Sequence, residues 1–324
     1  MEFTSLRNVY ALLAKTKTFR DVKVKVSSIY DSHPEEKCFL VETDPKSRKY
    51  KVRFTTESSK RSAATEHTAF NTLKQNNIKW VPQIYEYRPA DPAYLITEFK
   101  TGKSLDKSLT WTSAASNLVS GLSSILSEIH KIEGDYFGHL GSARYKSWRG
   151  FLDVRFWKHV NEVYEAKIIS SVDLRNIHML YEESGPIFDK SRPFFLHGDV
   201  KPANIVYNSR QKSVSLIDFE LARFGDIDFE WIRVYFLSKR WPAYRKLVSD
   251  SLLVGVKFKY ELETLRSPTI LIYSLYHLCS VLAFEHKKGL TIPKYRLEDL
   301  RVTLKAVYER FNEFLPPDQG TGRL

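Results

Sequence analysis

The sequence predicts an α+β fold of two lobes, with a small β-rich lobe over residues 1–99 and a larger, mainly helical lobe over residues 100–314. Short apolar segments separated by turn-forming residues are concentrated in the first third of the chain, which is typical of strands. Beyond it, apolar residues recur at three- and four-residue spacing, which is typical of amphipathic helices. Two prolines and two glycines within residues 315–324 indicate a flexible tail.

The composition is that of a globular protein without a disulfide scaffold. Of the 324 residues, 43% are hydrophobic and 27% are charged, so the chain can bury a large core and differs from a disordered one. Its two cysteines, Cys38 and Cys279, lie far apart and favour a reducing compartment. No apolar secretory segment follows Met1. The apolar residues 269–284 are shorter than the roughly 20 residues of a membrane span, so we expect them to form a buried helix. We therefore expect a cytoplasmic protein with no membrane partner.

The net charge of +12 has two possible meanings at the level of the sequence. A basic surface can attract nucleic acid or an anionic membrane. The lysines are scattered, however, and no nucleic-acid-binding motif is present, so we expect no nucleic-acid partner. Residues 151–200 differ from the rest, with six Lys/Arg against eight Asp/Glu. This acidic block is either a set of solvated helix faces or a wall for a cationic substrate.

The residues that carry chemistry are concentrated between residues 194 and 220. An apolar run, residues 194–196, leads into His-Gly-Asp, which ends at Asp199. Asn204 follows five residues later, and a second apolar strand, residues 214–217, leads to Asp218. Phosphoryl transfer needs one carboxylate to accept the proton of an attacking hydroxyl, and further oxygen ligands to hold Mg²⁺ on the phosphates. This spacing therefore indicates a phosphoryl-transfer site.

The His-Gly-Asp-x4-Asn…Ile-Asp pattern resembles that of the aminoglycoside phosphotransferase and choline kinase group of kinase-like enzymes. The resemblance is specific over residues 197–230 and loose in the N-terminal lobe. It implies a bilobal protein-kinase-like fold, with ATP or GTP as co-substrate, Mg²⁺ as cofactor and a small-molecule hydroxyl as acceptor. It also implies that Asp199 is the catalytic base and that Asn204 and Asp218 hold the Mg²⁺.

The third predicted strand, residues 50–54, should carry the cation that contacts the α- and β-phosphates. Lys51 and Arg53 lie on one face of this strand because side chains alternate. We align Arg53 with the family's strand cation, which directs Lys51 toward the adenine pocket, although the register could differ by two residues. Glu66, on a predicted helix over residues 60–75, is placed to pair with this cation.

Two further nucleotide contacts follow from the resemblance. A predicted strand over residues 94–99 ends before a Gly-containing connection, as at the hinge between kinase lobes, so the backbone near Glu98, Phe99 and Lys100 would contact adenine. The first hairpin loop contains no glycine, unlike the Gly-rich loop of protein kinases. Ser32 in this loop is a candidate for the phosphate contact, and a plain hairpin turn is the alternative.

Other polar residues near the motif have two interpretations each. Lys201 contacts the transferred phosphate or is a solvated lysine, and Glu220 faces the acceptor or does not. His197 is expected to hold the loop by hydrogen bonds rather than to act as a base. Asp226 and Glu230 are expected to be structural first, with Asp226 at a helix start, and facing an acceptor amine is their alternative role.

We thus expect a small-molecule O-phosphotransferase with an amine-bearing acceptor such as an aminoglycoside antibiotic. A protein Ser/Thr kinase is disfavoured because no Ala-Pro-Glu follows Asp218 and no Gly-rich loop is present. A nucleotide-binding module without transfer activity is disfavoured because Asp199, Asn204 and Asp218 are all retained. The acceptor, the choice of ATP or GTP, and the oligomeric state stay open.

Overall fold

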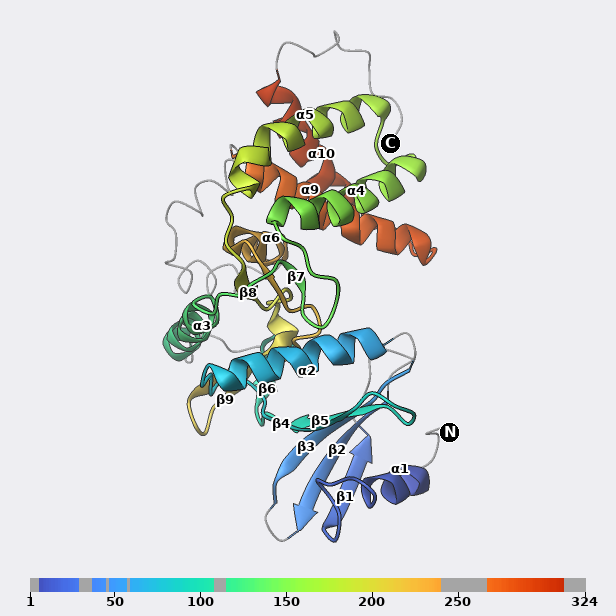
Figure 1. Ribbon diagram of the computed structural model, residues 1–324, viewed down its shortest axis with the longest axis vertical. Coiled ribbons are helices and arrows are strands. Elements are labelled where there is room, and N and C mark those ends of the chain that lie inside the picture. The colour runs from blue at the N-terminus through green and yellow to red at the C-terminus, as the bar shows by residue number, and fades with distance from the viewer. Residues whose placement is uncertain are drawn as a thin grey trace.

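The computed structural model describes residues 6–28, 37–44, 47–56, 59–107, 115–239 and 267–311. An antiparallel sheet with its helices forms one end of the molecule, and a group of helices forms the other (Figure 1). The expected α+β, kinase-like fold class is confirmed. The expected tail, residues 315–324, lies outside the described residues, as does most of the segment between residues 239 and 267.

The N-terminal lobe is a five-stranded antiparallel sheet in the order β1-β2-β3-β5-β4. Its strands are β1 (Lys23–Ser28), β2 (Lys37–Asp44), β3 (Lys49–Phe54), β4 (Ile84–Arg88) and β5 (Tyr94–Glu98). The helices of this lobe are α1 (Leu6–Leu13) and α2 (Lys60–Gln75). Apolar side chains of α1 and of β1, β2, β3 and β5 form one buried cluster. Helix α2 lies between the sheet and the helical lobe (Figure 1), so it can carry residues to the boundary of the lobes.

The C-terminal lobe is mainly helical. Its helices are α3 (Ala115–Ile129), α4 (Trp148–Glu165), α5 (Ser171–Phe188), α6 (Ile227–Ser238), α9 (Pro268–Lys287) and α10 (Lys294–Arg310). Helix α9 packs against α4, α5, α6 and α10. The indole N–H of Trp148 donates a 2.7 Å hydrogen bond to the hydroxyl of Tyr273, which joins α4 to α9 inside this core.

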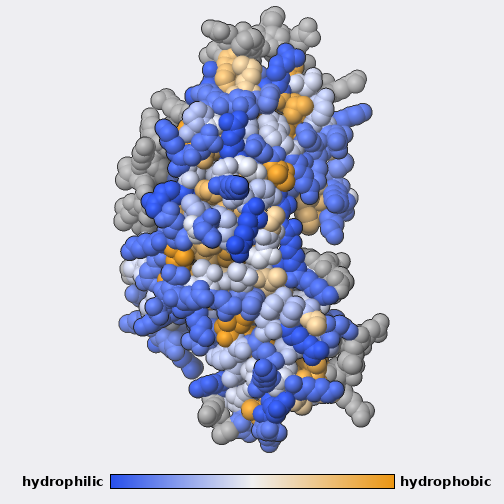
Figure 2. All heavy atoms as spheres, in the orientation of Figure 1, coloured by the Kyte–Doolittle hydropathy of each residue, from blue (hydrophilic) through white to orange (hydrophobic). Residues whose placement is uncertain are grey.

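Helix α9 includes the apolar residues 269–284 that were expected to form a buried helix. At 20 residues it is longer than expected, and by length and composition it could cross a membrane. Most of its apolar window is nevertheless buried inside the protein, as in the core helix of a globular domain. On the face seen in Figure 2, hydrophilic residues predominate and hydrophobic ones are scattered.

Two small sheets support the segment that carries the predicted chemistry. One has the order β10-β9-β6, and the other has the order β7-β11-β8. Their strands are β6 (Lys103–Ser104), β7 (Gly138–His139), β8 (Phe194–Leu196), β9 (Ile205–Asn208), β10 (Ser213–Leu216) and β11 (Arg223–Gly225). The loop from residue 197 to residue 204 joins β8 of one sheet to β9 of the other, so both of its ends are fixed.

Candidate active site

The loop over residues 197–204, here called the catalytic loop, begins with a turn that requires glycine. Gly198 has a φ of +80°, in the region that side chains rarely adopt. A Cβ atom at this position would lie 2.3 Å from the carbonyl oxygen of Leu221. Any other residue would therefore displace the loop.

His197 holds the loop through both of its ring nitrogens. Its Nε2 lies 2.9 Å from the carbonyl oxygen of Ile217, which can only accept, so Nε2 carries the proton. Its Nδ1 accepts the backbone N–H of Asp199 at 3.1 Å. Because the ring is completely buried and both nitrogens are occupied, the geometry fits the expected loop-holding role and leaves no nitrogen for proton transfer.

Glu230 of α6 fixes the start of the same loop. Its carboxylate accepts the backbone N–H of His197 at 2.6 Å and that of Gly198 at 2.8 Å. Burial on its own would raise the pKa of Glu230, but His130, His197 and the loop N–H of Gly198 together lower it. The expected structural role of Glu230 thus has a physical basis.

Asp226 begins helix α6, as expected. Its carboxylate accepts the backbone N–H of Asp228 at 2.9 Å and the hydroxyl of Ser191 at 2.6 Å. The first contact satisfies an N–H group that a helix start leaves without an internal partner. Asp226 therefore positions the helix that carries Glu230.

The carboxylate of Asp199 is almost fully buried and lies among three donors. Its Oδ2 is 2.7 Å from Nζ of Lys201 and 3.2 Å from Nδ2 of Asn204. Its Oδ1 is 2.8 Å from Nη2 of Arg233 on α6. We did not predict Arg233 from the sequence. The available signal was its position three residues after Glu230, which places both on one face of α6.

Asn204 lies beside this carboxylate, and Asp218 is brought next to Asn204 because the backbone N–H of Ile217 donates to the carbonyl of Asn204 at 2.9 Å. Nδ2 of Asn204 also donates to the backbone carbonyl of Asp199 at 2.9 Å, which leaves the amide oxygen of Asn204 for a cation. Asp218 is half-buried and has a φ of +68°, a strained backbone conformation of the kind found at functional sites. These hard oxygen donors suit Mg²⁺, which takes one or two protein ligands and completes its shell with phosphates and water. Among the described residues there is no larger cluster of His, Cys, Asp and Glu for a metal.

At the boundary of the lobes, Arg53 of β3 and Glu66 of α2 are brought together as expected. Nη2 of Arg53 lies 2.6 Å from the Glu66 carboxylate, and both side chains are buried. Glu220 lies 3.7 Å from Nη1 of the same guanidinium. The structure thus places Glu220 beside Arg53. Glu220 does not line the cavity bounded by β7, β8, β11, α4, α6 and α9.

Lys51 shares this face of β3. Burial would lower its pKa, but the carboxylates of Glu66 and Asp218 contribute to raising it above the usual value. Its ammonium group is therefore within electrostatic reach of both carboxylates. The sequence leaves open which of Lys51 and Arg53 contacts the phosphates, and this position supports Lys51 as a candidate for that contact.

At the expected hinge, two backbone groups are already used within the sheet. The N–H of Glu98 donates to the carbonyl of Gln83 at 2.8 Å, and the N–H of Phe99 donates to that of Lys49 at 3.0 Å. The carboxylate of Glu98 pairs with Nζ of Lys100 at 2.9 Å. An adenine contact would thus use carbonyl groups here and the N–H of Lys100. Ser32 lies outside the described residues.

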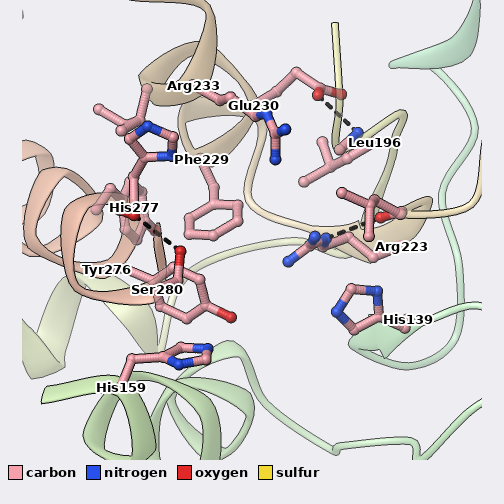
Figure 3. Close-up of a pocket in the computed structure, with 14 residues that line it drawn as sticks. His139, His159, Leu196, Arg223, Phe229, Glu230, Arg233, Tyr276, His277 and Ser280 are labelled. Carbon is pink, nitrogen blue, oxygen red and sulfur yellow. Dashed lines mark hydrogen bonds between the residues drawn. The ribbon is translucent and has the colours of Figure 1, made fainter. Parts of the chain in front are cut away.

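A cavity of about 200 Å³ lies on the far side of the catalytic loop from β3. It is bounded by residues of β7, α4, β8, β11, α6 and α9 (Figure 3). Its polar lining includes Arg223, Arg233, His139, His159, Tyr276 and Ser280. The lining acid is Glu230, which is already bonded to the catalytic loop. The wall of this cavity is therefore basic.

The acidic block of residues 151–200 contributes no carboxylate to this lining. Glu162 pairs with Lys158 and His159, and Glu182 pairs with Arg149. The interpretation of the block as a wall for a cationic substrate is therefore wrong for this cavity, because these acids are used in pairs along and between helices.

Comparison with known proteins gives one family and a consistent fold. A family described as the phosphotransferase enzyme family matches residues 36–261. Among curated proteins, none matches the sequence. A solved structure of an aminoglycoside phosphotransferase, APH(4)-Ia, in a ternary complex with AMP-PNP and hygromycin B is 14% identical, with a TM-score of 0.62 over 97% of this chain and 99% of that one.

Two other solved structures give similar values. An ADP-bound aminoglycoside phosphotransferase, APH(2'')-Ib, is 15% identical, with a TM-score of 0.61 over 94% of this chain and 99% of that one. The choline kinase LicA from Streptococcus pneumoniae is 14% identical, with a TM-score of 0.59 over the same shares. At these identities the likeness concerns the fold alone.

Proposed function

The chain belongs to the phosphotransferase enzyme family, and from this premise we propose that it transfers the γ-phosphate of ATP or GTP to a hydroxyl group of a small molecule. The observation that carries the proposal is the buried carboxylate of Asp199. It is fixed by the catalytic loop beside Asn204, with a lysine at 2.7 Å and an arginine at 2.8 Å. A carboxylate so placed can orient an acceptor hydroxyl and accept its proton.

Each remaining polar group of the site has a role in this reaction. Lys201 contacts Asp199, and its side chain is one-third exposed. It would contact the phosphate as it is transferred. The amide oxygen of Asn204 and the carboxylate of Asp218 would hold Mg²⁺. When bound, this ion neutralises charge on the phosphates. Glu230 and His197 keep Asp199 in position, which is a large part of what catalysis by positioning requires.

The nucleotide would lie between the two lobes. Lys51 and Arg53, beside Glu66, supply positive charge for its phosphates, and the backbone at Glu98–Lys100 offers hydrogen-bonding groups to its base. Relatives of the same fold have been solved with AMP-PNP and with ADP, which supports a nucleotide co-substrate.

The nature of the acceptor is the finer part of the proposal. An amine-bearing acceptor is what the sequence pattern suggests, and hygromycin B and gentamicin occupy complexes of related phosphotransferases. The basic lining of the cavity favours an anionic acceptor instead.

The proposal is tested by label transfer. The protein is incubated with Mg²⁺ and γ-labelled ATP or GTP against aminoglycosides, amino alcohols, sugars, hydroxy acids, sugar phosphates and a protein substrate. Asp199→Asn is expected to lose about 10²- to 10⁴-fold in kcat, with nucleotide binding retained. Failure of the wild-type protein to bind nucleotide would contradict the proposal. Label on the protein substrate alone would favour a protein kinase.

A further inference from the structure

Arg223 is a buried cation that has no carboxylate partner in the described part of the chain. Its side chain is 6% exposed. Its Nε donates to the carbonyl oxygen of Leu221 at 3.2 Å, and it also hydrogen-bonds to Tyr276. In the described part of the chain no Asp or Glu lies within ion-pair distance of it. Since buried charges are normally paired, this guanidinium is suited to an anion from outside.

The nearest acid cannot fill this role. Burial lowers the pKa of Arg223, and Glu230 opposes that shift only from a distance. Both oxygens of Glu230 accept backbone N–H groups of the catalytic loop, at 2.6 and 2.8 Å. Withdrawing them to pair with Arg223 would release the loop that positions Asp199.

A second guanidinium lies on the same cavity. Arg233 lines it and is one-third exposed, and its Nη2 touches Asp199. Arg233 thus connects the cavity to Asp199, the carboxylate proposed to accept the proton. Figure 3 shows both guanidinium groups at the cavity, with His139 and His159 on its other walls. A molecule there could place one group on the arginines and another at Asp199.

The other polar groups of the wall add no negative charge. Burial, together with nearby guanidinium groups, lowers the pKa of His139 to about 2, so this ring is neutral. Burial also lowers the pKa of His159. It raises the pKa of Tyr276, which therefore keeps its proton. Among the residues that the structure describes, an amine in this cavity would meet two cations and no carboxylate other than Glu230, which is bonded to the catalytic loop.

We propose that the acceptor is a small hydroxylated anion, whose carboxylate or phosphate group binds Arg223 and Arg233 while its hydroxyl faces Asp199. The inference rests on the proposed function. The cavity volume of about 200 Å³ is below the roughly 300–1,000 Å³ of sites for drug-sized ligands, which fits a molecule of the size of a hydroxy acid or a sugar phosphate.

The reaction then balances with the nucleoside triphosphate as phosphoryl donor. The acceptor oxygen forms a bond to the γ-phosphorus, and its proton passes to the carboxylate of Asp199. The bond between the γ-phosphorus and the β–γ bridging oxygen breaks, and its electron pair leaves with the nucleoside diphosphate. The anionic group of the acceptor stays unchanged.

Binding is measured first, so that it does not depend on turnover. The protein is saturated with Mg²⁺ and a non-hydrolysable nucleotide, which fills the phosphate-binding face of β3. Inorganic phosphate, glycerate and ethanolamine are then titrated calorimetrically. We expect phosphate and glycerate to bind and ethanolamine not to bind. Arg223→Met should weaken anion binding about 10- to 100-fold, whereas Arg223→Lys should retain part of it.

The matched control is Arg301→Met, which removes an exposed arginine of α10 paired with Glu298. It should leave anion binding unchanged, and the thermal midpoint of every variant reports folding. Nucleotide saturation is measured in the same samples, so a failure of the proposed function is seen as a loss of nucleotide binding. If nucleotide binds but neither anion does, or if Arg223→Met binds anions as wild type does, the inference is overturned.

Turnover distinguishes the two kinds of anion. Label transfer to hydroxy acids alone identifies a carboxylate, and transfer to sugar phosphates alone identifies a phosphate group, with the KM for the acceptor raised in Arg223→Met. Transfer to amino alcohols or aminoglycosides in preference to both would overturn the inference while supporting the proposed function.

Discussion

Two cations on the proposed nucleotide side of the catalytic loop, Arg53 and Lys100, have carboxylate partners, whereas Arg223 of the cavity has none among the described residues. Arg53 lies 2.6 Å from Glu66, and Lys100 lies 2.9 Å from Glu98. Arg223 has no such partner among the described residues, and Arg233 contacts only the carboxylate of Asp199. This difference is what the proposed anion site requires, because Arg53 is held by its ion pair and Arg223 is left to interact with a ligand.

The largest expected effect is a difference in stability between variants on the two sides of the catalytic loop. Glu66→Gln removes the charge of the carboxylate that lies 2.6 Å from the buried Arg53 guanidinium, so we expect the free energy of unfolding to fall by about 3 kcal/mol. Arg223→Met removes a buried cation without leaving an acid unpaired, and should change it by less than about 1 kcal/mol. Denaturant unfolding monitored by circular dichroism measures both. Equal losses would show that Arg223 is as tightly compensated as Arg53.

The second-largest expected effect is on the pH dependence of stability, and it arises at the catalytic loop. The pKa of Glu230 is lowered in the folded protein from an ordinary value of 4.5. Its contribution to stability is therefore fully present above that value and is lost as the pH falls through the lowered one. Glu230→Gln should remove this part of the pH dependence of stability. It should also lower stability near neutral pH, since hydrogen bonds to a charged group contribute about 1.5–3 kcal/mol.

Unfolding curves of wild type and Glu230→Gln between about pH 3 and pH 7 test this. The two stabilities should converge toward acid pH. A constant difference across the range would mean that the charge of Glu230 does not hold the loop. Glu298→Gln, which removes an exposed carboxylate of α10 paired with Arg301, is the control and should change stability by less than about 1 kcal/mol.

The smallest effect is expected at the hinge. Lys100 pairs with Glu98, and both side chains are partly exposed. Such a pair contributes about 0–1 kcal/mol. Lys100→Met should therefore leave stability nearly unchanged, and the KM for nucleotide should change less than about threefold, because the expected adenine contact is made by the backbone. A large rise in that KM would show that the side chain itself binds the nucleotide.

The catalytic loop could be predicted from the sequence because its parts are local. His197, Asp199 and Asn204 lie within eight positions, and a turn at Gly198 constrains their arrangement. Arg53 and Glu66 were paired correctly because a strand followed by a helix fixes which faces can meet. Which of Lys51 and Arg53 contacts the phosphates stays open, since alternation along a strand places both on one face and does not say how far a long side chain reaches.

The cavity could not be predicted in the same way. Its wall is assembled from β7, β8, β11, α4, α6 and α9, which are distant in sequence and meet only through packing of the helical lobe. Arg233 has no local motif that distinguishes it from a surface arginine. Composition could not decide between the two interpretations of the acidic block, because it counts charges but not their partners, and Glu162 and Glu182 are paired with neighbouring bases.

The two-sided organisation of the site is tested most directly by measuring both Michaelis constants in Lys51→Met and in Arg223→Met, with the acceptor identified by label transfer. We expect Lys51→Met to raise the KM for nucleotide by about tenfold and leave that for the acceptor unchanged, since each charged contact contributes at least about 1.4 kcal/mol. Arg223→Met should do the reverse. If both variants raise the same KM, or if neither variant raises either KM, the account is contradicted.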